Sequence, residues 1–300
     1  MQKEQNCYEK HAICIQCHNK PELINSLIKL LPKENFDFYI HVDEKSDIYY
    51  DIVREENIFF SERIDVCWGC SSQIKATLIL FDIIPTGKYK YIHLISGNDF
   101  IIKSVEEFLE FFSGKDTEYI ESNIINGNSS LNWESRYKVW YPGFLIKRPT
   151  YKLTRLLRFI YRVFVMRTGI LKKRNLPVRE FYGGSSWFSI TDDMLTWMKM
   201  YLSEHNDYLE FFEHSLCCDE VFFSTLVRQS PYVDRIANDA LRYLIWQGSN
   251  TGGPKELQKE DVGAMVVSPK LFARKITDIS VVEEIIKEIN FKEKSGDGVL

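Results

Sequence analysis

The sequence HAICIQC at His11–Cys17 is a short, almost continuous apolar run, and a similar run, FDFYIHV, occupies Phe36–Val42. Between them, Pro21 begins a segment whose apolar residues recur at the spacing of one helix face. A buried strand, a helix and a second buried strand predict two parallel strands joined by a helical crossover. The alternation continues with a helix expected at Ser72–Ile84 and strands expected at Ile58–Ser61 and Tyr91–Ile95. We therefore predict an α/β fold in which helices flank a mostly parallel, Rossmann-like sheet.

The composition is that of a globular protein. The chain has 300 residues, 45% of them hydrophobic, and a formal net charge of -4. This predicts one large continuous domain, within which we distinguish two halves, residues 1–125 and 126–300. A general nucleic-acid binder is disfavoured, because phosphate contacts require clustered positive charge on a basic chain. No signal-peptide pattern is visible and no apolar run reaches the roughly 20 residues of a membrane-spanning helix, so we expect a cytoplasmic location.

The chain contains seven cysteines, and an odd number in a cytoplasmic protein predicts free thiols. Cys14 and Cys17, together with Cys67 and Cys70, also imitate the spacing of a four-cysteine zinc site. However, Cys14 and Cys17 lie in an expected strand, where residues three apart point to opposite faces and cannot hold one ion. Buried thiols that act as small apolar side chains are the preferred interpretation.

Polar residues follow the ends of the expected strands. Asp43 comes directly after Phe36–Val42, and the loop Ser96–Asp99 comes after the strand at Tyr91–Ile95. Ligands of parallel sheets bind at the carboxyl ends of the strands, so both places are candidate binding loops. No glycine-rich dinucleotide fingerprint follows the first strand and no Walker-type loop occurs, which disfavours a nicotinamide-dependent oxidoreductase.

Two segments of the second half suggest a site for a hydroxyl-rich ligand. The small-residue turn at 183–186 leads into an expected aromatic strand at Trp187–Thr191, and Asp219 is expected to cap a helix that also carries Glu220. A carboxylate in the first turn of a helix suits a positioned base, although it could also serve only to stabilise the helix N-terminus. Two further elements are expected, a strand at Leu241–Trp246 and a short helix at Ser268–Lys275.

The segment 135–179 contains no acidic residue and is rich in lysine and arginine. Within it, basic side chains of residues 147–174 alternate with aromatic and aliphatic ones. A basic amphipathic helix of this kind can lie on an anionic membrane, and peripheral membrane contact through 147–174 is one expectation. The alternative is a helix that packs its apolar face on the core and turns its charges to water.

Seven short motifs occur in one order along the chain. They are His41–Asp43, Trp68–Ala76, Leu94–Phe100, Gly184–Ser189, Asp219–Glu220, Arg242–Trp246 and Phe272–Lys275. Each is weak by itself, but together they resemble the core-2/I-branching β-1,6-N-acetylglucosaminyltransferase family, which also includes peptide O-xylosyltransferases. The resemblance implies a glycosyltransferase A-type fold. It also implies inverting transfer of a sugar from a UDP-sugar, with UDP-N-acetylglucosamine as the first expectation, to a hydroxyl of a glycan or lipid-linked glycan.

The resemblance implies roles for individual residues. Glu220 would be the catalytic base, and Lys275 would neutralise the donor diphosphate, with Lys255 or Arg242 as a second cation. The other residues implied at the donor site are Asp43, Gly69, Ser72 and Gln73. Those implied at the acceptor site are Glu121, Asp99, Trp187 and Trp246. The half 1–125 would then bind the nucleotide sugar, and the half 126–300 would bind the acceptor and supply the base.

No metal ion or cofactor is expected. Metal-dependent relatives usually carry an Asp-x-Asp triplet at a strand end, and the nearest substitute in this sequence is Asp43-Glu44. The departing diphosphate gains negative charge, so fixed cations are expected to stabilise it in place of a metal. Two alternatives stay open: transfer from UDP-xylose or another UDP-hexose, and a non-catalytic glycan-binding protein. The expected place of action is the cytoplasm, at the inner face of the membrane if the basic segment binds there.

Overall fold

The computed structural model describes residues 9–126, 131–146, 152–168, 176–246 and 253–295. Its central sheet has five strands, β1 (His11–Cys17), β2 (Phe36–Val42), β3 (Ile58–Phe60), β4 (Tyr91–Ser96) and β8 (Phe188–Thr191). The strands lie in the order β3-β2-β1-β4-β8; the first four are parallel and β8 is antiparallel to β4. The predicted α/β fold with a mostly parallel sheet is thereby confirmed, including both ends of β1 and β2.

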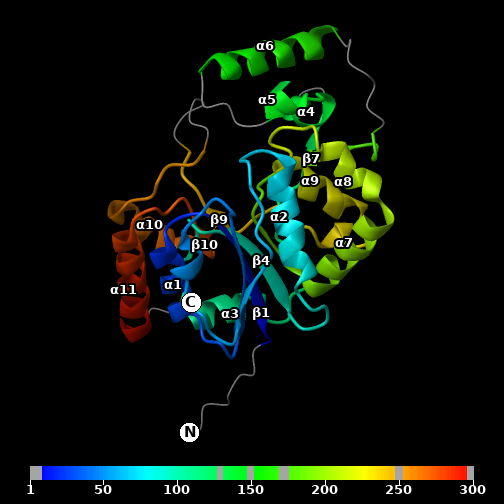
Figure 1. The fold of residues 1–300 in the computed structure, drawn as a ribbon. Helices are drawn as coiled ribbons and strands as arrows, with labels where there is room; N and C mark the ends of the chain where they lie inside the picture. The colour runs from blue at the N-terminus through cyan, green and yellow to red at the C-terminus, as the bar shows by residue number, and fades with distance from the viewer. Residues whose placement is uncertain (1–8, 127–130, 147–151, 169–175, 247–252, 296–300) are drawn as a thin grey trace.

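Helices cover both faces of this sheet (Figure 1). One face carries α1 (Pro21–Leu30), α3 (Val105–Phe112), α10 (Val262–Val267) and α11 (Ile279–Ser295). The other carries α2 (Ser71–Asp82), α7 (Asp192–Glu204), α8 (Asn206–Phe212) and α9 (Asp219–Leu226). Short 3₁₀ turns lie at Ile48–Tyr50, Val227–Gln229, Val233–Arg235 and Lys259–Asp261.

The side chains of β1 alternate between the two cores. Ile13 and Cys17 belong to the core under α1 and α3, whereas Ala12 and Cys14 belong to the core under α2 and α9. Because both faces of the sheet are buried, the sequence of β1 is almost continuously apolar and does not alternate between apolar and polar residues. The same alternation places the thiols of Cys14 and Cys17 on opposite faces of the sheet, as predicted.

Two smaller sheets join segments that are distant in the sequence. One has the order β5 (Phe100–Ile101), β10 (Phe272–Ala273), β9 (Arg242–Tyr243), and the other pairs β6 (Asn123–Ile125) with β7 (Phe181–Gly183). The strand predicted at Leu241–Trp246 is thus shorter than expected, and the helix predicted at Ser268–Lys275 is wrong. The chain leaves α10 at Val267, and the backbone of β10 pairs with strands on both sides, which requires extended rather than helical residues.

An outer layer consists of α4 (Leu131–Lys138), α5 (Gly143–Ile146) and α6 (Lys152–Thr168), with α6 at the periphery of the molecule in Figure 1. This layer has a small core of its own, formed by Val139, Tyr141, Leu145 and Val165. Residues 147–151 and 169–174 of the predicted basic segment lie outside the described residues. Among the described helices, none combines the length and the apolar character that crossing a membrane requires.

Candidate functional site

A cleft of about 1690 Å³ opens at the carboxyl ends of the parallel strands. Cys17 at the end of β1, Asp43 after β2 and Ser96 at the end of β4 all line it. The lining also includes the turn 183–187, the first residues of α9 and the segment that follows β10. Both strand-end loops that the sequence singled out therefore border the cleft.

Asp219 lies in the first turn of α9, at the cleft. The helix starts at Asp219 and Cys218 occupies the N-cap position, so the prediction that Asp219 caps this helix is wrong. The carboxylate is instead buried, and its Oδ2 accepts hydrogen bonds from Gln73 Nε2 at 3.0 Å and from Ser186 Oγ at 2.5 Å. Burial raises the pKa of Asp219. These bonds fix the start of α9 against α2 and against the small-residue turn.

Glu220 is the more accessible carboxylate of the pair, with 35% of its side chain exposed, and it lines the cleft. Its Oε2 forms an ion pair with Nη1 of Arg136, whose guanidinium carbon lies 3.9 Å from the centroid of the Trp133 ring. Burial raises the pKa of Glu220, whereas the charge of Arg136 favours the ionised form and opposes the rise. Arg136 was missed in the sequence, because nothing local to α4 shows that this arginine meets a carboxylate 84 positions away.

The turn at 183–187 connects Glu220 with Glu121. The backbone N–H of Gly184 donates to the carbonyl of Glu220 at 2.9 Å, and the N–H of Ser185 donates to Oε2 of Glu121 at 3.0 Å. Glu121 also lines the cleft. One short piece of backbone thus binds the carboxylate of Glu121 and the main chain of Glu220.

Replacing Gly184 should show how tightly this turn is packed. A Cβ at Gly184 would lie 2.3 Å from the carbonyl oxygen of Glu121, so Gly184→Ala must shift the backbone and should destabilise the protein by about 1–3 kcal/mol. Gly263→Ala is the matched control: among the described residues, no atom beyond its chain neighbours and its own helix backbone lies within 4 Å of the added Cβ, and it should stabilise α10 by up to about 1 kcal/mol. Denaturant unfolding of both variants checks this. Equal stability of the two would contradict the close approach at Gly184.

Two neighbouring cations after β10 line the cleft. Lys275 has 39% of its side chain exposed, and its Nζ lies 3.7 Å from Oε1 of Glu256. The guanidinium of Arg274 lies 4.9 Å from the Trp187 ring centroid and 3.9 Å from Oδ2 of Asp99. Its Nε and Nη1 are buried and find no hydrogen-bond partner among the described residues. A buried guanidinium with unused donors suits an anionic group of a ligand, because such donors are otherwise costly to bury.

Arg274 was not predicted as a cation of the site. The two predicted candidates for the second cation, Arg242 and Lys255, lie outside the cleft lining. The guanidinium of Arg242 is buried, donates to the carbonyls of Leu94 at 2.8 Å and Phe188 at 3.1 Å, and lies outside the cleft lining. Burial lowers its pKa to about 9. Lys255 donates to both carboxylate oxygens of Asp261 at 2.9 Å and is also absent from the lining. The structure thus places Arg242 outside the cleft lining, where it ties β9 to the central sheet.

Asp99 is likewise absent from the cleft lining. It is buried, and its Oδ2 accepts the N–H of Ser96 at 2.8 Å in addition to facing Arg274. Asp99, predicted as an acceptor-binding residue, thus closes its own loop and lies beside the guanidinium of Arg274.

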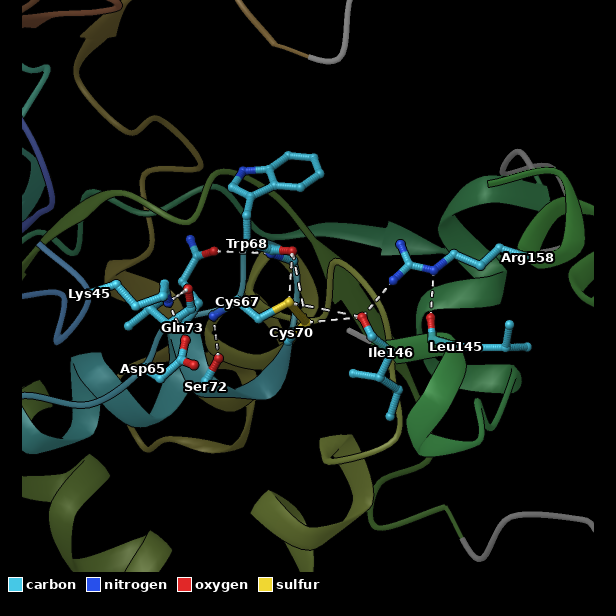
Figure 2. The surroundings of a disulfide bond; sticks show 12 residues. Lys45, Asp65, Cys67, Trp68, Cys70, Ser72, Gln73, Leu145, Ile146 and Arg158 are labelled. Carbon is cyan, nitrogen blue, oxygen red and sulfur yellow. Dashed lines mark hydrogen bonds and ion pairs between the residues drawn. A yellow bond between two sulfur atoms is a disulfide. The ribbon is translucent and has the colours of Figure 1, made fainter. Parts of the chain in front are cut away.

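The loop at the start of α2 lines the cleft beside Trp68 (Figure 2). The backbone at Gly69 has φ +72°, a conformation that glycine adopts without strain, and its N–H donates to Oε1 of Gln73 at 3.3 Å. Ser72 Oγ accepts from the N–H of Cys67 at 2.9 Å. The predicted donor residues Gly69, Ser72 and Gln73 thus lie together in the lining.

Cys67 and Cys70 form a disulfide in this loop (Figure 2). The expectation that the cysteines are free thiols is therefore wrong for this pair. The turn at Gly69 brings the two Cα atoms to 5.4 Å, within the range that a disulfide spans, and composition alone could not reveal this. The free cysteines of the described residues are Cys14, Cys17, Cys217 and Cys218.

Aromatic rings supply apolar surface to the cleft. The predicted acceptor residues Trp187 and Trp246 both line it, and so does Trp68, which was not predicted. Trp246 is 65% exposed and Trp68 is 57% exposed, so both rings present faces to a ligand. An aromatic ring offers an apolar face together with a polar edge, which suits a ligand of mixed character such as a sugar.

Comparison with known proteins places the chain among glycosyltransferase relatives. The family model described as "Branch: Core-2/I-Branching enzyme" matches residues 14–270. A xylosyltransferase of Ciona intestinalis is 22% identical over 306 aligned residues, covering 90% of this chain and 32% of that protein. Xylosyltransferase 2 of Rattus norvegicus is 22% identical over 296 residues, with 89% and 32% covered. The chain spans about one third of the length of these relatives.

Two solved structures are also similar. The apo structure of the bifunctional glycosyltransferase WbbM aligns with a TM-score of 0.39 at 9% identity, over 97% of this chain and 53% of that one. The apo form of GlyE from Streptococcus pneumoniae TIGR4 aligns with a TM-score of 0.37 at 8% identity, over 96% and 64%. The family model covers most of the sequence, and the chain therefore belongs to the Core-2/I-Branching enzyme family.

Proposed function

We propose that this protein is an inverting glycosyltransferase that moves a sugar from a UDP-sugar to a hydroxyl group of a glycan, with Glu220 as the base. The observation that carries the proposal is that Glu220 lines the same cleft as Arg274 and Lys275. In this proposal the half 1–125 contributes most of the donor site. The half 126–300 contributes the base, the phosphate cations and the acceptor groove.

The geometry around Glu220 suits proton abstraction. An acceptor hydroxyl is a poor nucleophile, so a base within hydrogen-bond reach must take its proton while the bond to the anomeric carbon forms. Burial raises the pKa of Glu220 and makes it a stronger base, and the charge of Arg136 favours the ionised form. Inversion needs a single base, which agrees with Asp219 being buried and engaged by Gln73 and Ser186.

The pH dependence tests the role of Arg136. Removing its charge in Arg136→Gln raises the pKa of Glu220 further, so the carboxylate becomes ionised only at higher pH. We therefore expect the acid limb of the kcat/KM profile to move to higher pH, with the largest loss of activity on the acid side. Lys138→Gln, which removes a cation on the same helix that is paired with Glu134, serves as the control. An unmoved acid limb in Arg136→Gln would refute this role.

The leaving diphosphate is stabilised by side-chain cations in this proposal. Lys275 and Arg274 would bind its oxygens, and the unused buried donors of Arg274 support this assignment. The proposed transfer therefore needs neither a cofactor nor a metal ion.

A chelator provides the corresponding test. Transfer rates measured in EDTA should equal those measured with added manganese, because the charge is neutralised by protein groups. Activity that EDTA removes and manganese restores would show that the proposed cations are insufficient.

The donor is proposed to be UDP-N-acetylglucosamine, with UDP-xylose as the second candidate because the curated relatives are named xylosyltransferases. A side-by-side assay of donor hydrolysis and of thermal shift with both UDP-sugars and with UDP separates the two. No thermal shift with UDP and no turnover with any UDP-sugar would instead favour a non-catalytic glycan-binding protein.

The acceptor groove is proposed to involve Glu121, Trp187 and Trp246, which all line the cleft. The proposed acceptor is a glycan or a lipid-linked glycan. The proposed place of action is the cytoplasm, at the inner face of the membrane, where a lipid-linked acceptor would be presented.

A further inference from the structure

Helix α6 turns an apolar face outward. Leu156, Ile160 and Phe164 follow one another at four-residue spacing and are 53%, 53% and 52% exposed. Leu157 and Phe159 flank this row and are 46% and 54% exposed. Residues four apart share one side of a helix, so these five side chains form a continuous apolar strip, which we call the α6 strip. A helix that only covered the core would bury such residues, whereas these side chains are about half exposed.

The opposite side of α6 attaches the helix to the rest of the protein. Val165 is buried in the small core with Leu145, and Tyr161 donates a hydrogen bond to the carbonyl of Trp140 at 2.9 Å. Arg158 donates to the carbonyls of Leu145 at 2.5 Å and Ile146 at 2.6 Å. The helix is therefore held by one side while the α6 strip faces outward.

The charge of the chain is strongly uneven around this helix. Residues 135–179 contain 13 of the 38 lysine and arginine residues and none of the 42 acidic residues. The remainder of the chain therefore holds 25 basic and 42 acidic residues, although the whole has a net charge of only -4. A local excess of positive charge attracts anionic surfaces and repels a second copy of itself.

We infer that the α6 strip docks this protein on an anionic lipid bilayer, with α6 lying along the membrane surface. The apolar side chains would enter the boundary between headgroups and acyl chains, and the net positive charge of the segment 135–179 would favour an anionic surface. Each lysine or arginine near such a surface contributes about 1 kcal/mol at moderate salt. Transfer of exposed phenylalanine and leucine side chains out of water is favourable and would strengthen binding. A purely electrostatic contact would leave these side chains in water.

The docking helix is connected to the cleft through a short chain of contacts (Figure 2). The carbonyl of Ile146, which accepts from Arg158, also lies 3.4 Å from Cys70 Sγ and 3.9 Å from Cys67 Sγ. Ile146, Cys67 and Cys70 all line the cleft. Docking through α6 would thus hold the membrane on the side of the cleft formed by the α2 loop.

Vesicle flotation tests the inference. Wild-type protein should float with vesicles of phosphatidylcholine and phosphatidylglycerol but not with phosphatidylcholine alone, and about 1 M salt, which shortens the Debye length to about 3 Å, should weaken binding. The triple variant Leu156→Gln, Ile160→Gln, Phe164→Gln should lower the bound fraction at least tenfold. The control variant Met200→Gln, Val267→Gln, Phe291→Gln changes three similarly exposed apolar residues on other helices and should bind as wild type does.

Circular dichroism and UDP thermal shift show whether each variant remains folded, and the latter does not depend on lipid. Absence of wild-type flotation, or flotation that the α6 variant does not reduce, would overturn the inference. A wild-type dimer that the α6 variant converts to monomer, without flotation of either, would also overturn it in favour of a second copy as the occupant.

Discussion

Glu220→Gln is expected to lower the rate of sugar transfer by about 100- to 10,000-fold, because an amide cannot accept the proton of the attacking hydroxyl. The side chain keeps its size, and its amide oxygen can still accept from Arg136, so the cleft should keep its shape. The affinity for UDP should stay nearly unchanged, since the cations that would bind the diphosphate are untouched. Single-turnover kinetics give the rate, and isothermal titration with UDP gives the affinity.

Glu213→Gln is the matched control for this experiment. Glu213 is 41% exposed at its side chain, pairs with Lys75 at 2.7 Å and is not in the cleft lining. Its replacement should leave transfer intact. If Glu220→Gln transferred sugar at the wild-type rate, the assignment of the base would fail. Loss of UDP binding together with loss of transfer would point to a collapsed cleft instead.

Removing the cations that face the cleft should have a comparable effect through a different step. Arg274→Ala and Lys275→Ala should each lower kcat by about 100- to 1000-fold. Positive side chains held beside the departing diphosphate stabilise the transition state more than the ground state, because the negative charge of the diphosphate grows as it leaves. Both variants should also bind UDP more weakly, in contrast to Glu220→Gln. This difference in UDP affinity separates leaving-group stabilisation from base catalysis.

Lys255→Ala supplies the control for the cation variants. Lys255 is a lysine of the same region whose charge is taken up by Asp261, and it does not line the cleft. Its loss should leave kcat and UDP affinity nearly unchanged. If Lys255→Ala and Lys275→Ala lowered kcat and UDP affinity equally, the cause would be a general loss of charge or stability and not a loss of diphosphate binding.

The sequence predicted those elements whose signals are local. β1 and β2 are apolar runs, and α1 begins at Pro21 as the helical spacing of its apolar residues predicted. The helix expected at Ser268–Lys275 failed for the opposite reason. Serine followed by proline is a good helix start, but pairing of β10 with distant strands overrides local preference there.

The sequence predicted which residues line the cleft only where their location is tied to their own segment. Asp43 and Ser96 follow strands, and Glu220 begins a helix, so their places in the cleft could be read from the order of elements. The roles of Arg242 and Arg274 depend on contacts between segments far apart in the sequence. Arg242 lies in the short strand β9, and Arg274 directly follows the short strand β10. Only the fold shows that Arg242 is buried against carbonyls and that Arg274 has unused donors beside the cleft.

The orientation of α6 could not be predicted for a similar reason. Periodicity shows that a helix has two unlike sides, but not which side meets the protein. The partner surface comes from α4 and α5, and Arg158 is directed inward by the carbonyls of Leu145 and Ile146. Without those contacts, burial of the apolar side was the more reasonable expectation.

The ties made by Asp219 separate two tasks within the molecule. Gln73 and Ser186 hold Asp219, the residue before the proposed base, from α2 and from the small-residue turn, and both lie outside the outer layer. Arg136, which lies over the Trp133 ring, pairs with Glu220 from α4. Substitutions in the outer layer, at Arg136 above all, would therefore alter the acidity of the proposed base while the start of α9 keeps its position. A change of working pH within one lineage would then arise most readily in α4, and the segments that hold Asp219 would tolerate the least alteration.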